Sequence, residues 1–415
     1  MPDTDFGIEL MRPEALADPY PLFHRMRRED LIHYSRTLGA WIVTRYDHVV
    51  QGFRDNRLGG DRLKFLIDSP LQTGERSVVK DFERIERGMM INKEGLEHLR
   101  LRRLVQHAFA PDRLLAARPS IQKAVDGLLE RADASGRLDI VADYAEPLPT
   151  LVICALMGIP AEDGPVLRQW SEAKGRFRGL SHGDKEAAAR AANEAAVNLE
   201  RYFLGLVEQR RRRPGNDLLS VLAAGHEEGR LSAAEVSAQC QLLFSAGHQT
   251  LIDQLCNGVH ALLSHPEQLR ELQGEPSRIG SAGEEVLRYD PSVSFMHRVA
   301  AADLEVGGQV IRQGELVLLG IAAANRDSDV FTDPERFDIR RVGKSHVSFA
   351  TGAHACLGMG LARLELEVAL LALFRRFPHL RLGQPGRPRY PGRCLWRSCI
   401  PDTQSKILAR PTRKV

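Results

Sequence analysis

Apolar residues recur at helical spacing along most of this chain, and the longest such stretch lies near its middle. Ser232 and Glu235 have the spacing of a capping box, in which the serine accepts a hydrogen bond from the third helical amide. No proline follows until Pro266, so about 32 residues, roughly 48 Å at 1.5 Å per residue, are predicted to form one helix. Apolar residues occupy several faces of this helix, which is typical of a buried one.

Strand signals are few by comparison. Trp41–Tyr46 predicts one strand, and residues 304–319 predict two short strands separated by glycines. Residues 187–212, rich in Ala, Glu, Leu and Arg and free of proline, predict a further helix, and Ser264 to Glu267 predict the cap of another. The pattern indicates a mainly α protein with a minor β lobe. Because no linker or repeat divides the chain, we expect a single domain over residues 1–415.

Composition narrows the class of protein. Hydrophobic residues make up 43% and charged residues 27% of the chain, as in an ordinary globular protein with an ample core. A net charge of +3 is too mild to indicate a nucleic-acid partner. The cysteines, at positions 154, 240, 256, 356, 394 and 399, form no Cys-x-x-Cys motif, which argues against a zinc ribbon and against covalently attached haem. A reducing cytoplasm fits this usage best.

No segment predicts insertion into a membrane. The amino terminus lacks the basic and apolar regions of a signal peptide. The longest apolar run, Leu151–Met157, lies between Pro149 and Gly158 and is too short to span a bilayer. We therefore interpret it as a buried helix and expect a cytoplasmic protein without a membrane anchor.

The loop around Cys356 carries the clearest chemical signal. The cysteine stands directly before a strongly helical run, where the helix dipole and free backbone N–H groups favour a thiolate. Gly352 permits a tight turn, and Gly358 lets a flat partner approach the backbone. A sulfur ligand to a metal held in a planar cofactor requires these features. The alternative is a buried structural cysteine, the commoner fate of a single thiol.

The amino-acid sequence of this loop is more specific than its expected geometry. Phe349-x-x-Gly352-x-His354-x-Cys356-x-Gly358-x-x-Leu-Ala-Arg closely resembles the haem-binding signature of the cytochrome P450 family, at every fixed position. The resemblance implies a cytochrome P450-like fold with the long central helix over haem b. It also implies that Cys356 is the axial thiolate ligand of the haem iron, a ligand that favours O–O cleavage.

The central helix contains the run Ala246-Gly247-His248-Gln249-Thr250. Glycine inside a buried helix costs about 1 kcal/mol relative to alanine, so a ligand, a local opening of the helix or tight helix packing must compensate. By resemblance this run crosses the distal haem face, and Thr250 matches the alcohol that hydrogen-bonds dioxygen. The family's usual acid is replaced by Gln249, whose amide does not titrate near neutrality. Our hypothesis is that Thr250, ordered water and either His248 or a substrate group deliver protons.

Several charged residues also match the family pattern. Glu285, Arg288 and Arg336 resemble its Glu-x-x-Arg helix and Pro-Glu-Arg-Phe segment, which implies an ion network that holds the cysteine loop. Four cations match partners of the haem propionates: His98, Arg102, Arg298 and His354. Taken singly, each is more typical of a surface charge.

The substrate pocket is weakly specified. The resemblance places Leu243, Val293, Phe295 and Met296 there, although Phe295 and Met296 fit a core equally well. Five cations suit either an acidic substrate or, more commonly, a solvated surface: Arg57, Arg62, Lys174, Arg176 and Arg178.

As a whole, the resemblance implies a haem-thiolate monooxygenase that inserts one oxygen atom from O2 into a small secondary-metabolite substrate, free or carrier-bound. The chain has no dinucleotide fingerprint, so electrons must come from a ferredoxin and a ferredoxin reductase that uses NAD(P)H. Arg103 and Arg113 suit an acidic ferredoxin. Three alternatives stay open: a peroxide-using or rearranging enzyme, because of Gln249; a non-catalytic haem protein; and a cysteine hydrolase built on Cys356 and His354.

Overall fold

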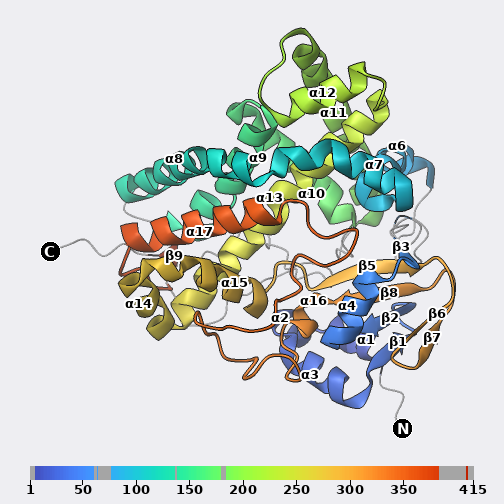
Figure 1. Cartoon of the computed structure of the whole chain (residues 1–415), viewed down its shortest axis with the longest axis vertical. Coiled ribbons are helices and arrows are strands. Elements are labelled where there is room, and N and C mark those ends of the chain that lie inside the picture. Colours follow the sequence, from blue (N-terminus) through green and yellow to red (C-terminus); the bar gives the residue numbers. More distant parts are fainter. Residues whose placement is uncertain are drawn as a thin grey trace. The chain divides into compact units, whose positions relative to one another are not determined.

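The computed structural model describes residues 5–59, 63, 76–135, 138–178, 184–382 and the backbone of 408–409. Figure 1 shows the elements of the chain along its sequence. The chain divides into two compact units. The first comprises residues 1–59, 118–148 and 250–415, and the second comprises residues 60–117 and 149–249. The single domain expected from the sequence stays a prediction.

The first unit contains the main sheet, whose strand order is β1-β2-β8-β5-β3. Its strands are β1 (Ile32–Ser35), β2 (Ala40–Val43), β3 (Leu58–Gly59), β5 (Phe295–Ala300) and β8 (Leu316–Gly320). Only β2 and β8 pair in parallel, and the other neighbours are antiparallel. Two small antiparallel pairs accompany the sheet: β4 (Leu138–Asp139) with β9 (Leu408–Ala409), and β6 (Leu304–Val306) with β7 (Gln309–Ile311).

Two strand predictions need correction. The strand predicted to reach Tyr46 ends at Val43, because Tyr46 is already the first residue of a helix. Residues 304–319 contain β6, β7 and the start of β8, three strands where two were predicted. The outcome depends on the sheet partners, since every residue of β8 is buried between neighbouring strands.

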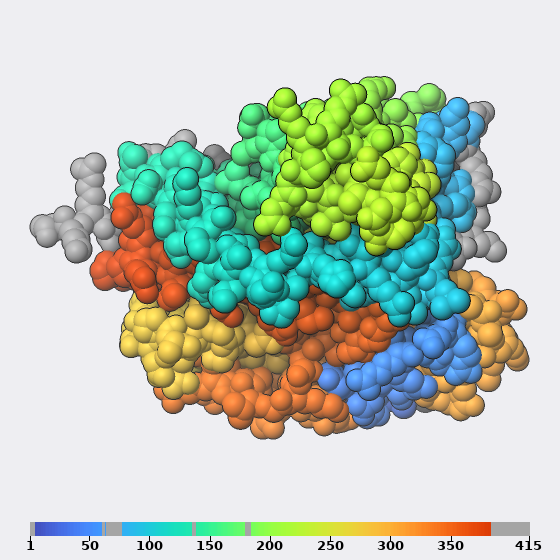
Figure 2. All heavy atoms as spheres, turned by 45° about the horizontal axis from the view of Figure 1, so that its top comes forward, coloured from blue at the N-terminus to red at the C-terminus, as the bar shows by residue number. Residues whose placement is uncertain are grey.

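Helices of the first unit pack around this sheet and beside one another. They are α1 (Phe6–Leu10), α2 (Pro13–Ala17), α3 (Tyr20–Glu29), α4 (Tyr46–Arg54), α14 (Pro266–Gly274), α15 (Ile279–Tyr289), α16 (Ile321–Ala324), α17 (Met359–Arg376) and most of α8 (Pro111–Ser135). Helices α8 and α17 run side by side in Figures 1 and 2. Arg376 of α17 donates to Asp133 of α8 at 2.5 Å, which ties the two helices near their carboxyl ends.

The second unit is helical throughout its described residues. It contains α6 (Lys80–Gly88), α7 (Gly95–Gln106), nearly all of α9 (Pro147–Met157), α10 (Gly164–Arg178), α11 (Lys185–Arg212) and α12 (Leu218–Glu227). An apolar core joins α6, α10 and α11 through residues such as Phe82, Phe177 and Ala192. Helix α11 confirms the helix predicted over residues 187–212. The remaining short turns of the two units are η1 (Arg76–Val79), η2 (Met90–Asn92), η3 (His107–Phe109), η4 (Ile140–Ala145), η5 (Ala161–Asp163) and η6 (Pro276–Arg278).

The long central helix is confirmed as α13 (Ala233–Ser264), 32 residues without interruption. Its capping box is present: the Glu235 carboxylate accepts from the Ser232 amide at 2.8 Å, and the Ser232 hydroxyl accepts from the Glu235 amide at 3.2 Å. Residues 233–249 are counted with the second unit and residues 250–264 with the first. The cap predicted for the next helix is wrong, because α14 has His265 at its N-cap and no side-chain cap.

Within the described residues, one helical stretch, 140–157, is long and apolar enough to cross a membrane, with a mean hydropathy of 1.5. It is 56% buried inside the structure, as expected of a core helix. This agrees with the interpretation of Leu151–Met157 as buried.

Candidate active site

The Cys356 loop is held in a tight turn by its own backbone. The Cys356 amide donates to the carbonyl of Phe349 at 2.9 Å, and the Ala355 amide donates to that of Gly352 at 3.1 Å. Gly352 has a φ of 77°, and a Cβ at this position would lie 2.5 Å from the carbonyl oxygen of Phe53. Both the left-handed backbone and the close approach therefore require glycine here.

Cys356 differs from the other described cysteines in its surroundings. None of the four described cysteines forms a disulfide, but Cys154, Cys240 and Cys256 are buried whereas Cys356 is half-buried. Burial raises the pKa of the Cys154 thiol to about 12 and also raises those of Cys240 and Cys256, so these three are poor thiolates. Cys356 instead lies two residues before Gly358, the N-cap of α17. Cys394 and Cys399 lie outside the described residues.

Helix α15 fastens the cysteine loop to α17. Glu284 accepts from Arg363 at 2.7 and 2.9 Å and lies 3.5 Å from His346. Although burial opposes it, these hydrogen bonds from His346 and Arg363 lower the pKa of Glu284 to about 2. The Arg363 guanidinium lies 4.8 Å from the ring centroid of Phe349. The aromatic residue of the signature thus makes a cation–π contact with an arginine that is itself held by the Glu284 ion pair.

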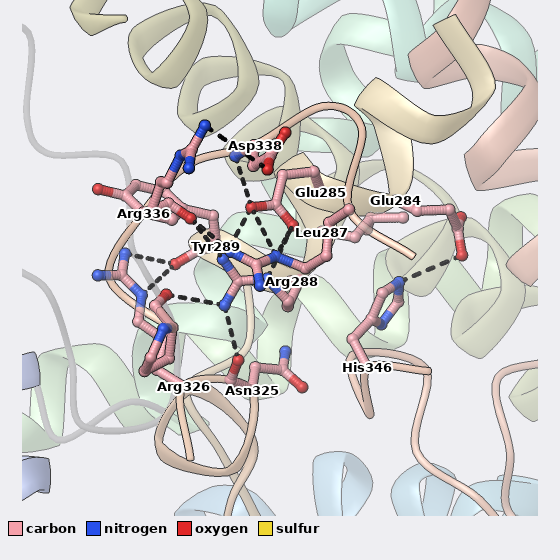
Figure 3. Close-up of polar contacts among 12 residues, drawn as sticks. Glu284, Glu285, Leu287, Arg288, Tyr289, Asn325, Arg326, Arg336, Asp338 and His346 are labelled. Carbon is pink, nitrogen blue, oxygen red and sulfur yellow. Dashed lines mark hydrogen bonds and ion pairs between the residues drawn. The ribbon is translucent and has the colours of Figure 1, made fainter. Parts of the chain in front are cut away.

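A buried ion pair on the same helix holds the segment that precedes the loop (Figure 3). Arg288 donates twice to Glu285 at 2.8 Å, and both side chains are almost wholly buried. The other guanidinium hydrogen bonds of Arg288 go to the carbonyls of Asn325 (2.9 Å), Pro334 (2.9 Å) and Arg336 (3.2 Å). The predicted Glu285–Arg288 pair is therefore present.

The predicted role of the Arg336 side chain is wrong. Its guanidinium is 65% exposed and comes no closer than 4.0 Å to Asp338, so Arg336 contributes its carbonyl and not its charge. The second cation on Glu285 is Arg341, whose Nε lies 3.1 Å from the carboxylate. Spacing relative to the signature could not distinguish these two arginines, because both lie in the same irregular segment.

Two uncharged residues complete the support and were not predicted. Asn325 donates to the Ser348 hydroxyl at 2.7 Å and accepts from the Val347 amide at 2.8 Å. The Ser348 hydroxyl donates in turn to the Leu287 carbonyl of α15 at 2.7 Å. No motif marks Asn325 or Ser348, since their role depends on a contact across more than twenty residues.

Between residues 236 and 259 of α13, the positions that are not buried lie at or near the predicted catalytic run. Ala246 is exposed and Thr250 is half-buried, while His248 and Gln249 are buried. Positions 246 and 250 are one turn apart and share a helix face. The helix thus presents a small residue and an alcohol on the same accessible strip.

Gly247 is explained by packing. A Cβ at Gly247 would lie 2.6 Å from Cδ1 of Ile153, and α13 is not opened at this point. Tight helix packing, one of the three reasons considered for this glycine, therefore accounts for it. His248 donates through Nδ1 to the Phe244 carbonyl at 2.7 Å, because a carbonyl can only accept.

Gln249 is joined to α10. Its Nε2 donates to the Ser171 hydroxyl at 3.0 Å, and its Oε1 accepts from Ser245 at 3.4 Å. The amide is therefore engaged at both ends by hydroxyl groups. It neither titrates nor adjoins a carboxylate in these contacts.

The four predicted propionate partners are divided between the two units. His98, which is buried, and Arg102 lie one turn apart on α7 in the second unit. Arg298 and His354 lie in the first unit. Arg298 is buried, donates to the His297 carbonyl at 2.9 Å and lies 5.6 Å from the ring centroid of Phe53, the residue whose carbonyl abuts Gly352. The propionate role of all four stays a prediction.

The predicted substrate residues differ in their surroundings. Phe295 is buried and meets Phe23 edge to face, 5.5 Å between ring centroids, as a core residue does. Leu243 is also buried, whereas Val293 and Met296 are half-buried beside the cluster around the main sheet. Arg62 lies outside the described residues, and Lys174 is buried rather than solvated.

These residues fit a haem with an iron–sulfur bond. Cys356, a half-buried thiol just before the N-terminus of α17, would supply the ligand. When bound, haem supplies one-electron redox chemistry and activation of O2.

Comparisons with known proteins identify the family. The family model of cytochrome P450 matches residues 65–392. Nocardicin C N-oxygenase from Nocardia uniformis subsp. tsuyamanensis is 39% identical over 350 residues, which cover 83% of this chain and 84% of the relative. The 6-deoxyerythronolide B hydroxylase from Saccharopolyspora erythraea is 37% identical over 374 residues, covering 88% and 90%.

The solved structures agree. P450BioI in complex with hexadec-9Z-enoic acid ligated acyl carrier protein superposes with a TM-score of 0.82 at 34% identity, covering 89% of this chain and 94% of that one. Because the relatives are hydroxylases and oxygenases, a non-catalytic haem protein and a cysteine hydrolase are not supported. The chain belongs to the cytochrome P450 family and is a haem-dependent monooxygenase.

Proposed function

We propose that this enzyme inserts one oxygen atom from O2 into a small organic molecule of secondary metabolism. The second oxygen atom leaves as water, which requires two electrons and two protons. The electrons come singly from a ferredoxin and its NAD(P)H-dependent reductase. The cofactor is haem b, with Cys356 as the axial ligand. The compartment is the cytoplasm, in keeping with four described cysteines that form no disulfide.

The observation that carries this proposal is the setting of Cys356. It is the one described thiol that is not buried, and it lies at the start of α17. Two ion pairs of α15 hold the residues around it, Glu284–Arg363 and Glu285–Arg288. A ligand loop fixed this firmly keeps the sulfur in one place, which a metal–thiolate bond requires.

The ligand assignment is tested by Cys356→Ser beside a control, Cys240→Ala. The control removes a buried thiol on α13. We expect the reduced carbonyl adduct of the wild type and of the control to show the red-shifted Soret band of thiolate ligation, and Cys356→Ser to lack it. A serine variant that keeps this band would overturn the assignment.

For proton delivery, we propose that Thr250 donates through its hydroxyl and is resupplied by ordered water. Gln249 cannot supply the proton, because its amide does not titrate and is bound to Ser171 and Ser245. Because Nδ1 of His248 donates to the Phe244 carbonyl, we propose Thr250 rather than His248 as the carrier, and comparing Thr250→Ala with His248→Gln separates the two routes. Loss of coupling in the threonine variant alone supports Thr250.

The substrate class is proposed from the relatives. One hydroxylates 6-deoxyerythronolide B, and a structural neighbour was solved with a fatty acyl group on an acyl carrier protein. We propose a substrate of similar kind, either free or bound to a carrier. Titrating the ferric enzyme with free fatty acids and with the same acyl groups on a carrier protein, and recording the loss of the water-ligated spectrum, decides between the two forms.

A second candidate function is supported by Gln249. Without an acid beside Thr250, peroxide is an alternative source of both the oxygen atom and its electrons, with water as the by-product. Product formed with hydrogen peroxide alone, at a rate equal to that with ferredoxin, reductase and NAD(P)H, favours this candidate.

We also propose that Arg103 and Arg113 attract the acidic ferredoxin. Both side chains are exposed in the second unit. Reversing both charges to Glu should slow ferredoxin-dependent reduction at low salt, and the difference should shrink at high salt because surface charges are screened. An unchanged rate at low salt would exclude these residues.

A further inference from the structure

A buried ion cluster joins α6 to α10 in the second unit. Glu86 of α6 accepts from Arg178 of α10 through both carboxylate oxygens, with one contact at 3.2 Å, and lies 3.2 Å from Nζ of Lys174. Lys174 also donates to Oε1 of Gln241 on α13 at 2.5 Å. The Glu86 carboxylate thus pairs with two cations of α10, and one of them, Lys174, also contacts a third helix, α13.

Within this cluster the charge of Lys174 is kept at a cost in folding energy, whereas Arg178 and Lys174 lower the pKa of Glu86 although burial opposes this. Glu86 and Lys174 are both almost wholly buried. Burial, and to a lesser extent the neighbouring Arg178, lowers the pKa of Lys174 to about 8 even though Glu86 opposes this change. A buried lysine whose charged form is disfavoured adds little to stability, so a role in positioning is the better explanation.

The cluster does not suit an acidic substrate. The Lys174 side chain is only 3% exposed and is already occupied by Glu86 and Gln241. A ligand carboxylate would first have to displace Glu86, the counter-ion of both cations. Lys174 is therefore excluded as a contact for an acidic substrate, a role that the sequence had left open.

The face of α10 that carries the cluster also carries the contact to Gln249. Ser171, Lys174 and Arg178 are spaced three and four residues apart, so they share one face of the helix. Ser171 accepts from Gln249 at 3.0 Å, and Gly175 lies beside that amide, where a Cβ would be 3.4 Å from Nε2, an ordinary van der Waals distance. Gln249 directly precedes Thr250 in α13.

We propose that Glu86, Lys174 and Arg178 are positioning residues that fix α10 and, through Ser171, fix the Gln249 amide and the turn of α13 that carries Thr250. The cluster sets where the alcohol of Thr250 lies while touching neither substrate nor cofactor. This inference rests on the proposed role of Thr250.

The test compares Glu86→Gln, Ser171→Ala and the double variant with a control, Glu83→Gln. Glu83 is on the same helix and pairs with Arg87 near the surface, at 2.8 Å. Two readouts serve: hydrogen exchange by mass spectrometry over α10 and residues 245–250, and the dissociation constant of 4-phenylimidazole from its Soret shift. This probe binds the haem iron on the side that Thr250 is proposed to face.

We expect Glu86→Gln and Ser171→Ala each to speed exchange in residues 245–250. Each should raise the dissociation constant of 4-phenylimidazole by about three- to tenfold, the loss of affinity expected for about one hydrogen bond. The double variant should bind 4-phenylimidazole as tightly as the single variant with the lower affinity, because both changes break the same chain of contacts. Glu83→Gln should match the wild type.

Two results would overturn the inference: exchange that changes only in α6 and α10, or effects of the two variants that multiply. If Glu86→Gln does not fold, Arg178→Gln, at a side chain 25% exposed, replaces it under the same criteria. The proposed function fails separately, since it requires the red-shifted carbonyl band in the wild type, whatever these variants do.

Discussion

Nε2 of Gln249 on α13 donates a hydrogen bond to the Ser171 hydroxyl on α10 at 3.0 Å, which links the two helices. The position before Thr250 is here a neutral link between helices. A neutral link carries no proton, and it also needs no buried counter-ion. The charges that hold α10 lie one and two turns away from Ser171, at Lys174 and Arg178, and are balanced by Glu86.

A carboxylate at position 249 is expected to make coupling depend on pH. In Gln249→Glu the acid would face Ser171 and Ser245 in a buried site, where desolvation raises the pKa of a carboxyl group. We expect the ratio of peroxide released to NAD(P)H consumed to titrate in this variant, rising as the acid ionises, and to stay level in the wild type over the same range. A surrogate substrate that shifts the ferric spectrum suffices for the assay.

Gln249→Leu is the matched control, since it removes the link without adding an acid. If the glutamate variant shows the same ratio as the wild type at every pH, the side chain at 249 does not limit proton delivery.

Gly247→Ala is expected to destabilise the protein through a steric clash. The new Cβ would lie 2.6 Å from Ile153 Cδ1, and overpacking of this kind costs about 1–3 kcal/mol. Gly205→Ala in α11 is the control: nothing lies within 4 Å of its Cβ, so helix propensity alone should stabilise it by about 0.5–1 kcal/mol. Denaturant unfolding measures both. Adding Ile153→Val should restore part of the loss, and a Gly247→Ala protein as stable as Gly205→Ala would contradict the packing explanation.

Arg288 and Arg336 should differ sharply in their contribution to stability. Arg288→Gln leaves the Glu285 carboxylate without its bidentate partner in a buried site, which costs about 3–5 kcal/mol. Arg336→Ala removes an exposed guanidinium and should change the free energy of unfolding by less than about 0.5 kcal/mol. Arg341→Ala should fall between them, because Glu285 keeps Arg288. If both substitutions lowered the free energy of unfolding equally, Arg336 would belong to the ion network of Glu285, as the sequence suggested.

Lys174 should make stability rise with pH in the alkaline range. Its pKa is about 8 in the folded protein against 10.5 for an unperturbed lysine. Between these values the unfolded chain binds more protons than the native protein, so the free energy of unfolding increases with pH, by up to a few kcal/mol in total. Below pH 8 the cost of the buried charge is fully present.

Lys174→Met has no proton to lose in either state and keeps the Glu86–Arg178 pair. The difference in unfolding free energy between wild type and variant should therefore change in favour of the wild type from pH 8 to 10. Parallel curves for the two proteins would show that Lys174 is not held at a depressed pKa.

Local patterns in the chain were sufficient for several features. The capping box at Ser232 and the absence of proline predicted α13 because helix ends and helix interiors are encoded by residues within a few positions of each other. The Cys356 loop was predictable for the same reason, since its glycines, its thiol and the start of α17 are contiguous. Glu285 and Arg288 pair one turn apart on a single helix.

Contacts between distant segments were decided by the tertiary structure. Arg341 rather than Arg336 reaches Glu285, Gln249 meets a serine 78 positions away, and Glu86 meets two cations of α10. Periodicity gives the face of a helix on which a residue lies but not the partner that this face meets. The depressed pKa of Lys174 depends on that partner and on the exclusion of water, and both exist only once the helices have packed.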